Sequence, residues 1–123
     1  MTMEQAPPWD GALVEEDGRR IEASLGPLPP AMPNPALVVM VGLPGSGKSH
    51  FTRRLQAIFP LVRLESDALR RLLFGQPTYS PEESGRLFTA CHWVIDRLLA
   101  GGRSVVLDAT NLREVHRRRL YAI

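Results

Sequence analysis

The sequence contains little cysteine, no long apolar run and almost no lysine. Because Cys91 is the one cysteine, no disulfide can form within the chain, and no cluster of cysteine and histidine has the spacing of a zinc site. No apolar run approaches the roughly 18 residues of a membrane-spanning helix, and residues 1–10 lack a basic end followed by an apolar core. These absences exclude disulfide-rich and zinc-stapled folds and predict a cytoplasmic protein with no membrane partner.

The composition is that of an ordinary globular domain. Of the 123 residues 44% are hydrophobic and 23% are charged, which allows one modest domain. Residues 1–35 contain two arginines and six acidic residues, whereas residues 36–123 contain 13 basic and seven acidic residues. A basic body fits a phosphate-rich ligand such as a nucleotide or nucleic acid, although arginines on a plain solvated surface produce the same excess. Lys48 is the one lysine among 15 basic residues.

Proline usage divides the chain into two parts. Residues 1–35 hold seven of the 11 prolines and are expected to form a Pro-rich acidic tail or linker that is mostly extended. This stretch has room for one short helix around Leu13 to Leu25. Residues 36–123 are expected to form the folded core.

Short apolar runs alternate with helical patterns after residue 35, and this order predicts an α/β fold with three parallel strands. Two local signals mark helix starts: Ser66 as a cap, and the capping box of Ser80, Pro81 and Glu83. The predicted elements are strand 36–41, helix 48–59, strand 61–65 with Arg63 interrupting it, a helix after Ser66 that runs to about residue 74, helix 81–100, strand 104–108 and a helix from residue 113. On the helix 81–100, apolar residues at helical spacing are predicted to lie in the core: Leu87, Phe88, Trp93, Val94, Leu98 and Leu99. Cys91 and His92 are interpreted as packing or surface groups.

The most informative motif lies between the first strand and the following helix. It fits the P-loop pattern G-x-x-x-x-G-K-[ST] and comprises Gly42, Leu43, Pro44, Gly45, Ser46, Gly47, Lys48 and Ser49. The glycines allow backbone N–H groups to turn inward and bind phosphate, and the helix that follows adds the positive end of its dipole. Lys48 can reach the β- and γ-phosphates, and the Ser49 hydroxyl can bind Mg²⁺. The alternative is a glycine-rich turn with an incidental lysine.

The third strand helps to identify the class of P-loop protein. It leads into Asp108-Ala109-Thr110-Asn111, which lacks the glycine of the D-x-x-G motif of signalling GTPases and the glutamate that activates water in hydrolytic motors. A protein built for attack by water is therefore disfavoured.

Asp67 and Arg70 follow the second strand and lie three residues apart at the start of a helix. In a doubly wound sheet this strand end faces the same crevice as the P-loop. A carboxylate there can accept the proton of an attacking hydroxyl, and an arginine can bind phosphate. The alternative is a simple ion pair on the helix surface.

From residue 36 onward the chain resembles the small P-loop kinases that include polynucleotide 5′-hydroxyl kinases and zeta-toxin-like kinases. The residues that support the resemblance are the motif at 42–49, Ser66-Asp67-Ala68-Leu69-Arg70 and Asp108-Ala109-Thr110-Asn111-Leu112. The resemblance implies a P-loop NTPase fold, ATP and Mg²⁺ as cofactors, and a hydroxyl-bearing acceptor such as a nucleic-acid 5′ end or a nucleotide-like metabolite. It also implies Asp67 as general base, Arg70 as a phosphate-binding residue and Asp108 as a site aspartate near Mg²⁺ or the acceptor. Asp108 could instead cap the following helix.

Two departures from this family are visible. His50 replaces the second hydroxyl residue that often follows the P-loop serine, so a hydroxyl contact to the α-phosphate is replaced or lost. The family also has two further strands and an arginine-bearing lid, so residues 36–123 are expected to form an incomplete core. An unpaired apolar strand edge then predicts self-association.

The sequence therefore predicts an ATP-dependent kinase that phosphorylates a hydroxyl acceptor. Two other functions stay open: a regulatory module that binds ATP without useful turnover, and a slow ATP hydrolase. The basic stretch Arg113, Arg117, Arg118 and Arg119 can bind a nucleic-acid backbone or phosphate, or form a solvated helix face.

Overall fold

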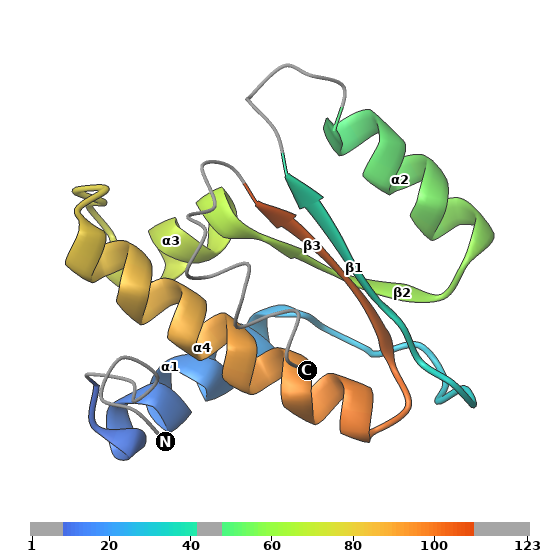
Figure 1. Ribbon diagram of the computed structural model, residues 1–123, viewed down its shortest axis with the longest axis horizontal. Coiled ribbons are helices and arrows are strands. Elements are labelled where there is room, and N and C mark those ends of the chain that lie inside the picture. The colour runs from blue at the N-terminus through green and yellow to red at the C-terminus, as the bar shows by residue number, and fades with distance from the viewer. Residues whose placement is uncertain (1–8, 42–47, 110–123) are drawn as a thin grey trace.

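Three parallel strands form one sheet at the centre of the molecule. The computed structural model describes residues 9–41 and 48–109 (Figure 1). Within these ranges the strands are β1 (Leu37–Val41), β2 (Leu61–Glu65) and β3 (Ser104–Ala109), in the order β1-β3-β2. Both pairings are parallel, as predicted for apolar strands joined by helices. The last of the three described strands, β3, therefore lies in the middle of the sheet.

Helices cover both faces of the sheet (Figure 1). The helix α2 (Lys48–Ile58) lies on one face, and α3 (Ser66–Phe74) and α4 (Pro81–Ala100) lie on the other. The α/β fold and every predicted element between residues 36 and 109 are confirmed, with ends that differ by at most one residue. The helix expected from Arg113 onward lies outside the described residues.

The hydrophobic core lies between the sheet and α4. Val105 and Leu107 of β3 and Leu64 of β2 have no exposed surface, and they pack with Leu87, Val94 and Ile95 of α4. Among the predicted core residues of α4, Leu87, Phe88, Val94 and Leu98 are buried, whereas Trp93 and Leu99 are half-buried and pack against the core. The alternation along β2 explains Arg63, because this residue points to the α2 face while its neighbours Val62 and Leu64 enter the core.

The capping predictions have different outcomes. At α4 the Ser80 side chain accepts a hydrogen bond from the Glu83 N–H at 3.1 Å, and Pro81 occupies the first helical position, as predicted. At α3 the prediction is wrong, because Glu65 is the N-cap residue and Ser66 is the first residue of the helix. The helix follows β2 without a connecting residue, so no position is left for Ser66 outside the helix.

The helix α1 (Gly11–Ser24) falls where a short helix around Leu13 to Leu25 was expected. It packs against α4, outside the sheet layers (Figure 1). Arg86 of α4 donates two hydrogen bonds, of 2.8 and 3.0 Å, to the buried carboxylate of Asp17. Arg20 donates to the carbonyl of Leu72 at 2.7 Å, at the end of α3. This part of the proline-rich segment is therefore joined to the core by specific contacts.

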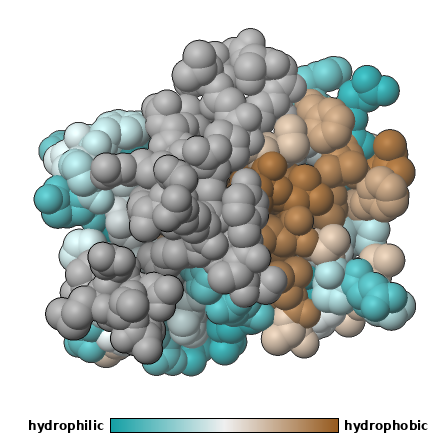
Figure 2. Space-filling view, in the orientation of Figure 1, coloured by the Kyte–Doolittle hydropathy of each residue, from teal (hydrophilic) through white to brown (hydrophobic). Residues whose placement is uncertain are grey.

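An apolar groove lies on the α2 side of the molecule, where Figure 2 shows a hydrophobic patch. Its walls include Leu55 and Phe59 of the α2 region and Val38 of β1. Leu61 and Ser104, the first residues of β2 and β3, also line it. The groove thus lies at the amino ends of the strands, whereas the P-loop motif follows the carboxyl end of β1.

Candidate functional site

The carboxyl ends of the three strands meet at one edge of the sheet. Asp108 of β3 is in register with Met40 of β1 on one side and with Glu65 of β2 on the other. The P-loop motif begins directly after β1, and α3 begins directly after β2. The topology therefore places the phosphate-binding motif, Asp108 and the start of α3 at the same edge, as parallel α/β folds place their ligand sites.

Part of the predicted P-loop lies outside the described residues, namely Gly42, Leu43, Pro44, Gly45, Ser46 and Gly47. Lys48 and Ser49 open α2, and their side chains also lie outside the described part of the structure. His50 is exposed on the first turn of α2. The strand, the motif and the helix nevertheless follow one another in the order that a P-loop requires.

Asp108 is buried at the centre of the strand ends, with 1% of its surface exposed. Its Oδ2 atom accepts a hydrogen bond from Arg63 Nη2 at 3.1 Å. The same Arg63 nitrogen lies 3.1 Å from Glu65 Oε2, so one guanidinium links two carboxylates at the ends of neighbouring strands. The sequence suggested only that Arg63 interrupts a strand. A buried carboxylate requires a partner of opposite charge, and Arg63 provides it.

Asp67 is half-buried in the first turn of α3. The positive end of the helix dipole favours a carboxylate at this position. Its side chain forms no hydrogen bond or ion pair with the residues that the structure describes, and it does not pair with Arg70. The simple surface ion pair considered above is therefore absent from the described structure.

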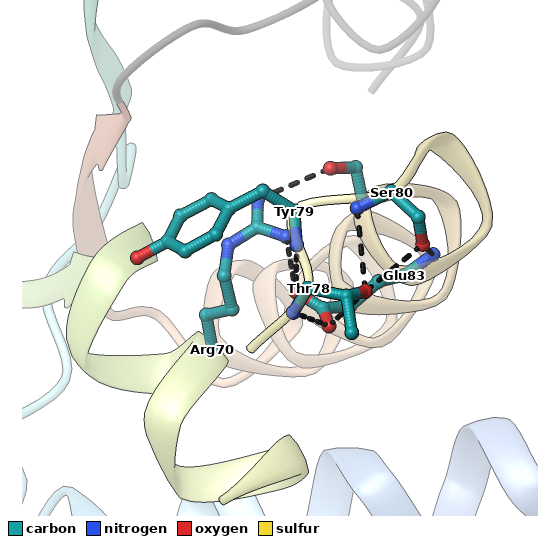
Figure 3. A network of polar contacts seen from close by, with 6 residues as sticks. Arg70, Thr78, Tyr79, Ser80 and Glu83 are labelled. Carbon is teal, nitrogen blue, oxygen red and sulfur yellow. Dashed lines mark hydrogen bonds and ion pairs between the residues drawn. The ribbon is translucent and has the colours of Figure 1, made fainter. Parts of the chain in front are cut away.

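Arg70 points from α3 toward the start of α4 (Figure 3). Its Nη1 donates to Glu83 Oε1 at 2.8 Å and its Nη2 donates to Ser84 Oγ at 3.2 Å. The Tyr79 ring covers the guanidinium, with 4.7 Å between the Arg70 Cζ atom and the ring centre. Arg70 is 5% exposed, and its Nε is buried without a hydrogen-bond partner among the described residues.

Glu83 is the acceptor at the centre of this network (Figure 3). It accepts hydrogen bonds from the Thr78 N–H at 2.7 Å, the Thr78 hydroxyl at 2.9 Å and the Tyr79 N–H at 3.2 Å, besides the bond from Arg70. Burial acts to raise the pKa of Glu83, but the bonds from Thr78, Arg70 and Tyr79 outweigh it and lower this pKa from 4.5 to about 2. Glu83 is therefore ionised at neutral pH and compensates the buried charge of Arg70.

Sequence reasoning missed this network apart from the capping role of Ser80 and Glu83. In a capping box the glutamate returns to the N–H of the cap residue, but here the Glu83 carboxylate reaches Thr78 and Tyr79, which precede the cap. The one available signal was a positive charge at Arg70 and a negative charge at Glu83 on consecutive helices.

Other reactive residues lie away from this network or are inactive. Cys91 is fully buried on α4, and burial raises the pKa of its thiol to about 12, so it is a packing group. His92 Nδ1 lies 3.5 Å from Asp96 Oδ2 on the same helix. Over residues 9–41 and 48–109 no group of three or more acidic, histidine or cysteine side chains is arranged to hold a metal ion. No helix in these ranges is long and apolar enough to span a membrane.

Comparisons with known proteins agree with this geometry. Residues 37–123 match the model of a family described as the AAA domain. A chain of the solved Pnkp1/Rnl/Hen1 complex is 34% identical, with a TM-score of 0.58 over 68% of the present chain. The match covers 30% of that larger chain. No curated protein is similar enough to match.

Proposed function

Because the chain belongs to the AAA domain family and is a P-loop protein like the polynucleotide kinases, we propose that it transfers the γ-phosphoryl group of ATP to a hydroxyl acceptor. The observation that supports this proposal most is the position of Asp67. The start of α3 shares a sheet edge with the P-loop motif, and the Asp67 carboxylate is not engaged by any described residue.

The proposed reaction needs a base, a phosphate clamp and an acceptor site. The acceptor hydroxyl oxygen attacks the γ-phosphorus, the bond from this phosphorus to the β–γ bridging oxygen breaks, and ADP leaves. Asp67 accepts the proton of the attacking hydroxyl, which is a general-base contribution of about 10²- to 10⁴-fold. Lys48 and the backbone of residues 42–47 bind the phosphates of ATP.

Mg²⁺ is the cation implied by a P-loop and ATP. The Asp108 carboxylate at the strand ends offers oxygen ligands of the kind that Mg²⁺ prefers, and Ser49 is the hydroxyl residue that the sequence offers as a second ligand. When bound, Mg²⁺ neutralises charge on the phosphates. Arg63 holds the Asp108 carboxylate in place at the centre of the strand ends through an ion pair of 3.1 Å.

A phosphate-binding role for Arg70 remains part of the proposal. Its contacts with Glu83 and Ser84 fix the side chain and link α3, which bears Asp67, to α4. Because Arg70 is 5% exposed and lies beneath the Tyr79 ring, direct contact with an acceptor phosphate requires these contacts to change. The likeness to a chain of the Pnkp1/Rnl/Hen1 complex supports a nucleic-acid 5′ end among the acceptors to be tested first.

Incubation with γ-labelled ATP, Mg²⁺ and a panel of hydroxyl acceptors tests the function. The panel contains a 5′-hydroxyl oligonucleotide, a nucleoside and a small polyol. Label on an acceptor supports the kinase, label only in free phosphate supports the hydrolase, and bound but intact ATP supports the binding module. Lys48→Met removes the lysine of the P-loop motif from the same assay. Arg53→Met is its matched control, because Arg53 is an exposed charge on the same helix.

One edge of β1 is unpaired among the described strands, and this supports the proposal that two copies of the chain associate. Within the described residues β1 pairs with β3 alone, and the apolar groove with Phe59 lies beside it. An unpaired apolar strand edge favours association. In light scattering the molecular mass of the parent should rise with concentration, whereas Phe59→Lys should keep the mass of a monomer. If the parent has the mass of a monomer at every concentration, the proposal is contradicted.

A further inference from the structure

Tyr79 is a large exposed aromatic residue whose ring covers Arg70, three residues after the proposed base Asp67. Its side chain lies in the connection between α3 and α4, and 59% of the residue is exposed. Other exposed large apolar residues of the described chain lie elsewhere, for example Phe51 and Ile58 on α2, on the opposite side of the sheet. Tyr79 is also not among the residues that line the apolar groove on the α2 side.

The Tyr79 ring packs on Arg70, and its backbone is hydrogen-bonded to Glu83. Its inner face lies on the Arg70 guanidinium, and its backbone N–H donates to Glu83 Oε1 at 3.2 Å. Its backbone has a φ of 57°, a left-handed conformation that a bulky residue adopts only at an energetic cost. The hydrogen bonds to Glu83 from Thr78 and Tyr79 stabilise this conformation. A ring that is already fixed loses little conformational entropy when a ligand stacks on it.

The position of the ring relates it to the proposed base. Arg70, which it covers, lies one helical turn after Asp67, about 4.5 Å along α3 at 1.5 Å per residue. Figure 3 shows the Tyr79 ring over Arg70 with its hydroxyl directed toward the side of α3. A planar group attached to an acceptor whose hydroxyl reaches Asp67 can therefore meet the outer face of this ring.

We propose that Tyr79 is a specificity residue whose outer ring face stacks on a nucleobase of the acceptor. This inference rests on the proposed kinase function and adds a requirement to it: the acceptor has a base next to its reacting hydroxyl. The cation beneath Tyr79 is already paired with Glu83, so the ring is the exposed part of the cluster. Stacking of a base on an aromatic side chain tolerates every base, and the expected preference is for a base rather than for a sequence.

The test compares two 5′-hydroxyl oligonucleotides that differ only in the base on the first sugar, which is present in one and absent in the other. The parent chain should phosphorylate the base-bearing acceptor with a kcat/KM higher by on the order of 10-fold. Tyr79→Ala should remove this difference by raising KM for the base-bearing acceptor. The kcat/KM for the abasic acceptor and the affinity for ATP should be unchanged. Tyr79→Phe should behave as the parent.

Tyr79→Leu separates stacking from mere coverage of Arg70. Leucine still shields the ion pair from water but offers no flat ring, so it should behave as alanine does toward the two acceptors. Equal losses on both acceptors, or no change in Tyr79→Ala, would overturn the inference. If the parent transfers no label to either oligonucleotide, the kinase function fails, and the inference is then tested by equilibrium binding of the same two oligonucleotides to the parent and to Tyr79→Ala. If the parent binds the two oligonucleotides with equal affinity, or if Tyr79→Ala binds them as the parent does, the inference is overturned in this binding experiment as well.

Discussion

Arg70 Nη1 lies 2.8 Å from Glu83 Oε1, and both side chains are more than nine-tenths buried. This pair joins the helix that bears Asp67 to the first turn of α4. The Coulomb attraction of a buried pair largely offsets the cost of removing two charges from water, so the pair specifies an arrangement more than it adds stability. Removing the charge of only one partner is expected to cost more stability, because the remaining charge stays buried without compensation.

Glu83→Gln should therefore destabilise the protein by about 3–5 kcal/mol. The amide keeps an oxygen that can accept bonds from Thr78 but removes the charge that compensates Arg70. Urea unfolding followed by circular dichroism measures the change. Glu82→Gln, on the exposed neighbour, should alter the free energy of unfolding by no more than about 0.5 kcal/mol. Equal effects of the two variants would show that the pair is not important for stability.

The pH dependence of stability should identify the same group. The folded-state pKa of Glu83 is lowered to about 2 from an ordinary value of 4.5. A lowered carboxyl pKa contributes stability that is fully present above 4.5 and is lost as the pH falls through about 2. The difference in free energy of unfolding between the parent and Glu83→Gln should thus be constant above about pH 5 and shrink steadily below it. If the difference in free energy of unfolding between the two proteins instead becomes smaller as the pH rises above 5, Glu83 is not the group responsible.

Local patterns were sufficient to predict most of the fold. The apolar runs that became β1 and β3, the capping of α4 by Ser80 and the P-loop motif all depend on residues within a few positions of one another. The family implied by these motifs is confirmed as well. Asp67 was placed correctly at the strand end because parallel strands in such folds point their carboxyl ends to one edge.

The polar contacts that connect distant elements could not be predicted in this way. Arg63 and Asp108 are 45 residues apart, and Asp17 and Arg86 are 69 residues apart. Each pair forms because tertiary packing buries one carboxylate, which then requires a cation. No spacing of residues in the sequence predicts which arginine makes that contact. The central place of β3 follows from the same long-range pairing.

Lys48→Met should weaken ATP binding or abolish transfer while the fold survives. The ammonium group is a compact charge between phosphates, and methionine keeps the length of the side chain without it. Titration with ATP, followed by calorimetry, measures the affinity, and circular dichroism monitors the fold. A variant that binds and turns over ATP as the parent does would exclude a P-loop function for residues 42–49.

Asp67→Asn should lower the transfer rate by about 10²- to 10⁴-fold and leave the affinity for ATP nearly unchanged. Stability should also stay within about 0.5 kcal/mol of the parent, since the described structure gives this carboxylate no hydrogen bond to lose. Single-turnover transfer of labelled phosphate, with ATP affinity measured separately, distinguishes the two effects. An unchanged rate would remove Asp67 from the proposed mechanism.

Gly18→Ala should separate α1 from α4, because the two helices approach so closely there that only glycine fits. A Cβ atom added at Gly18 would lie 2.1 Å from the Trp93 ring. The face of this ring also contacts Arg97, whose Cζ atom lies 4.7 Å from the ring centre. Since Trp93 cannot move without losing these contacts, the substitution should destabilise the protein by about 1–3 kcal/mol, although alanine favours a helix. Gly11→Ala is the matched control in the same helix, where an added Cβ meets nothing within 4 Å. The control should be neutral or slightly stabilising in urea unfolding, and a similar result for Gly18→Ala would mean that α1 is not fixed to α4 at this point.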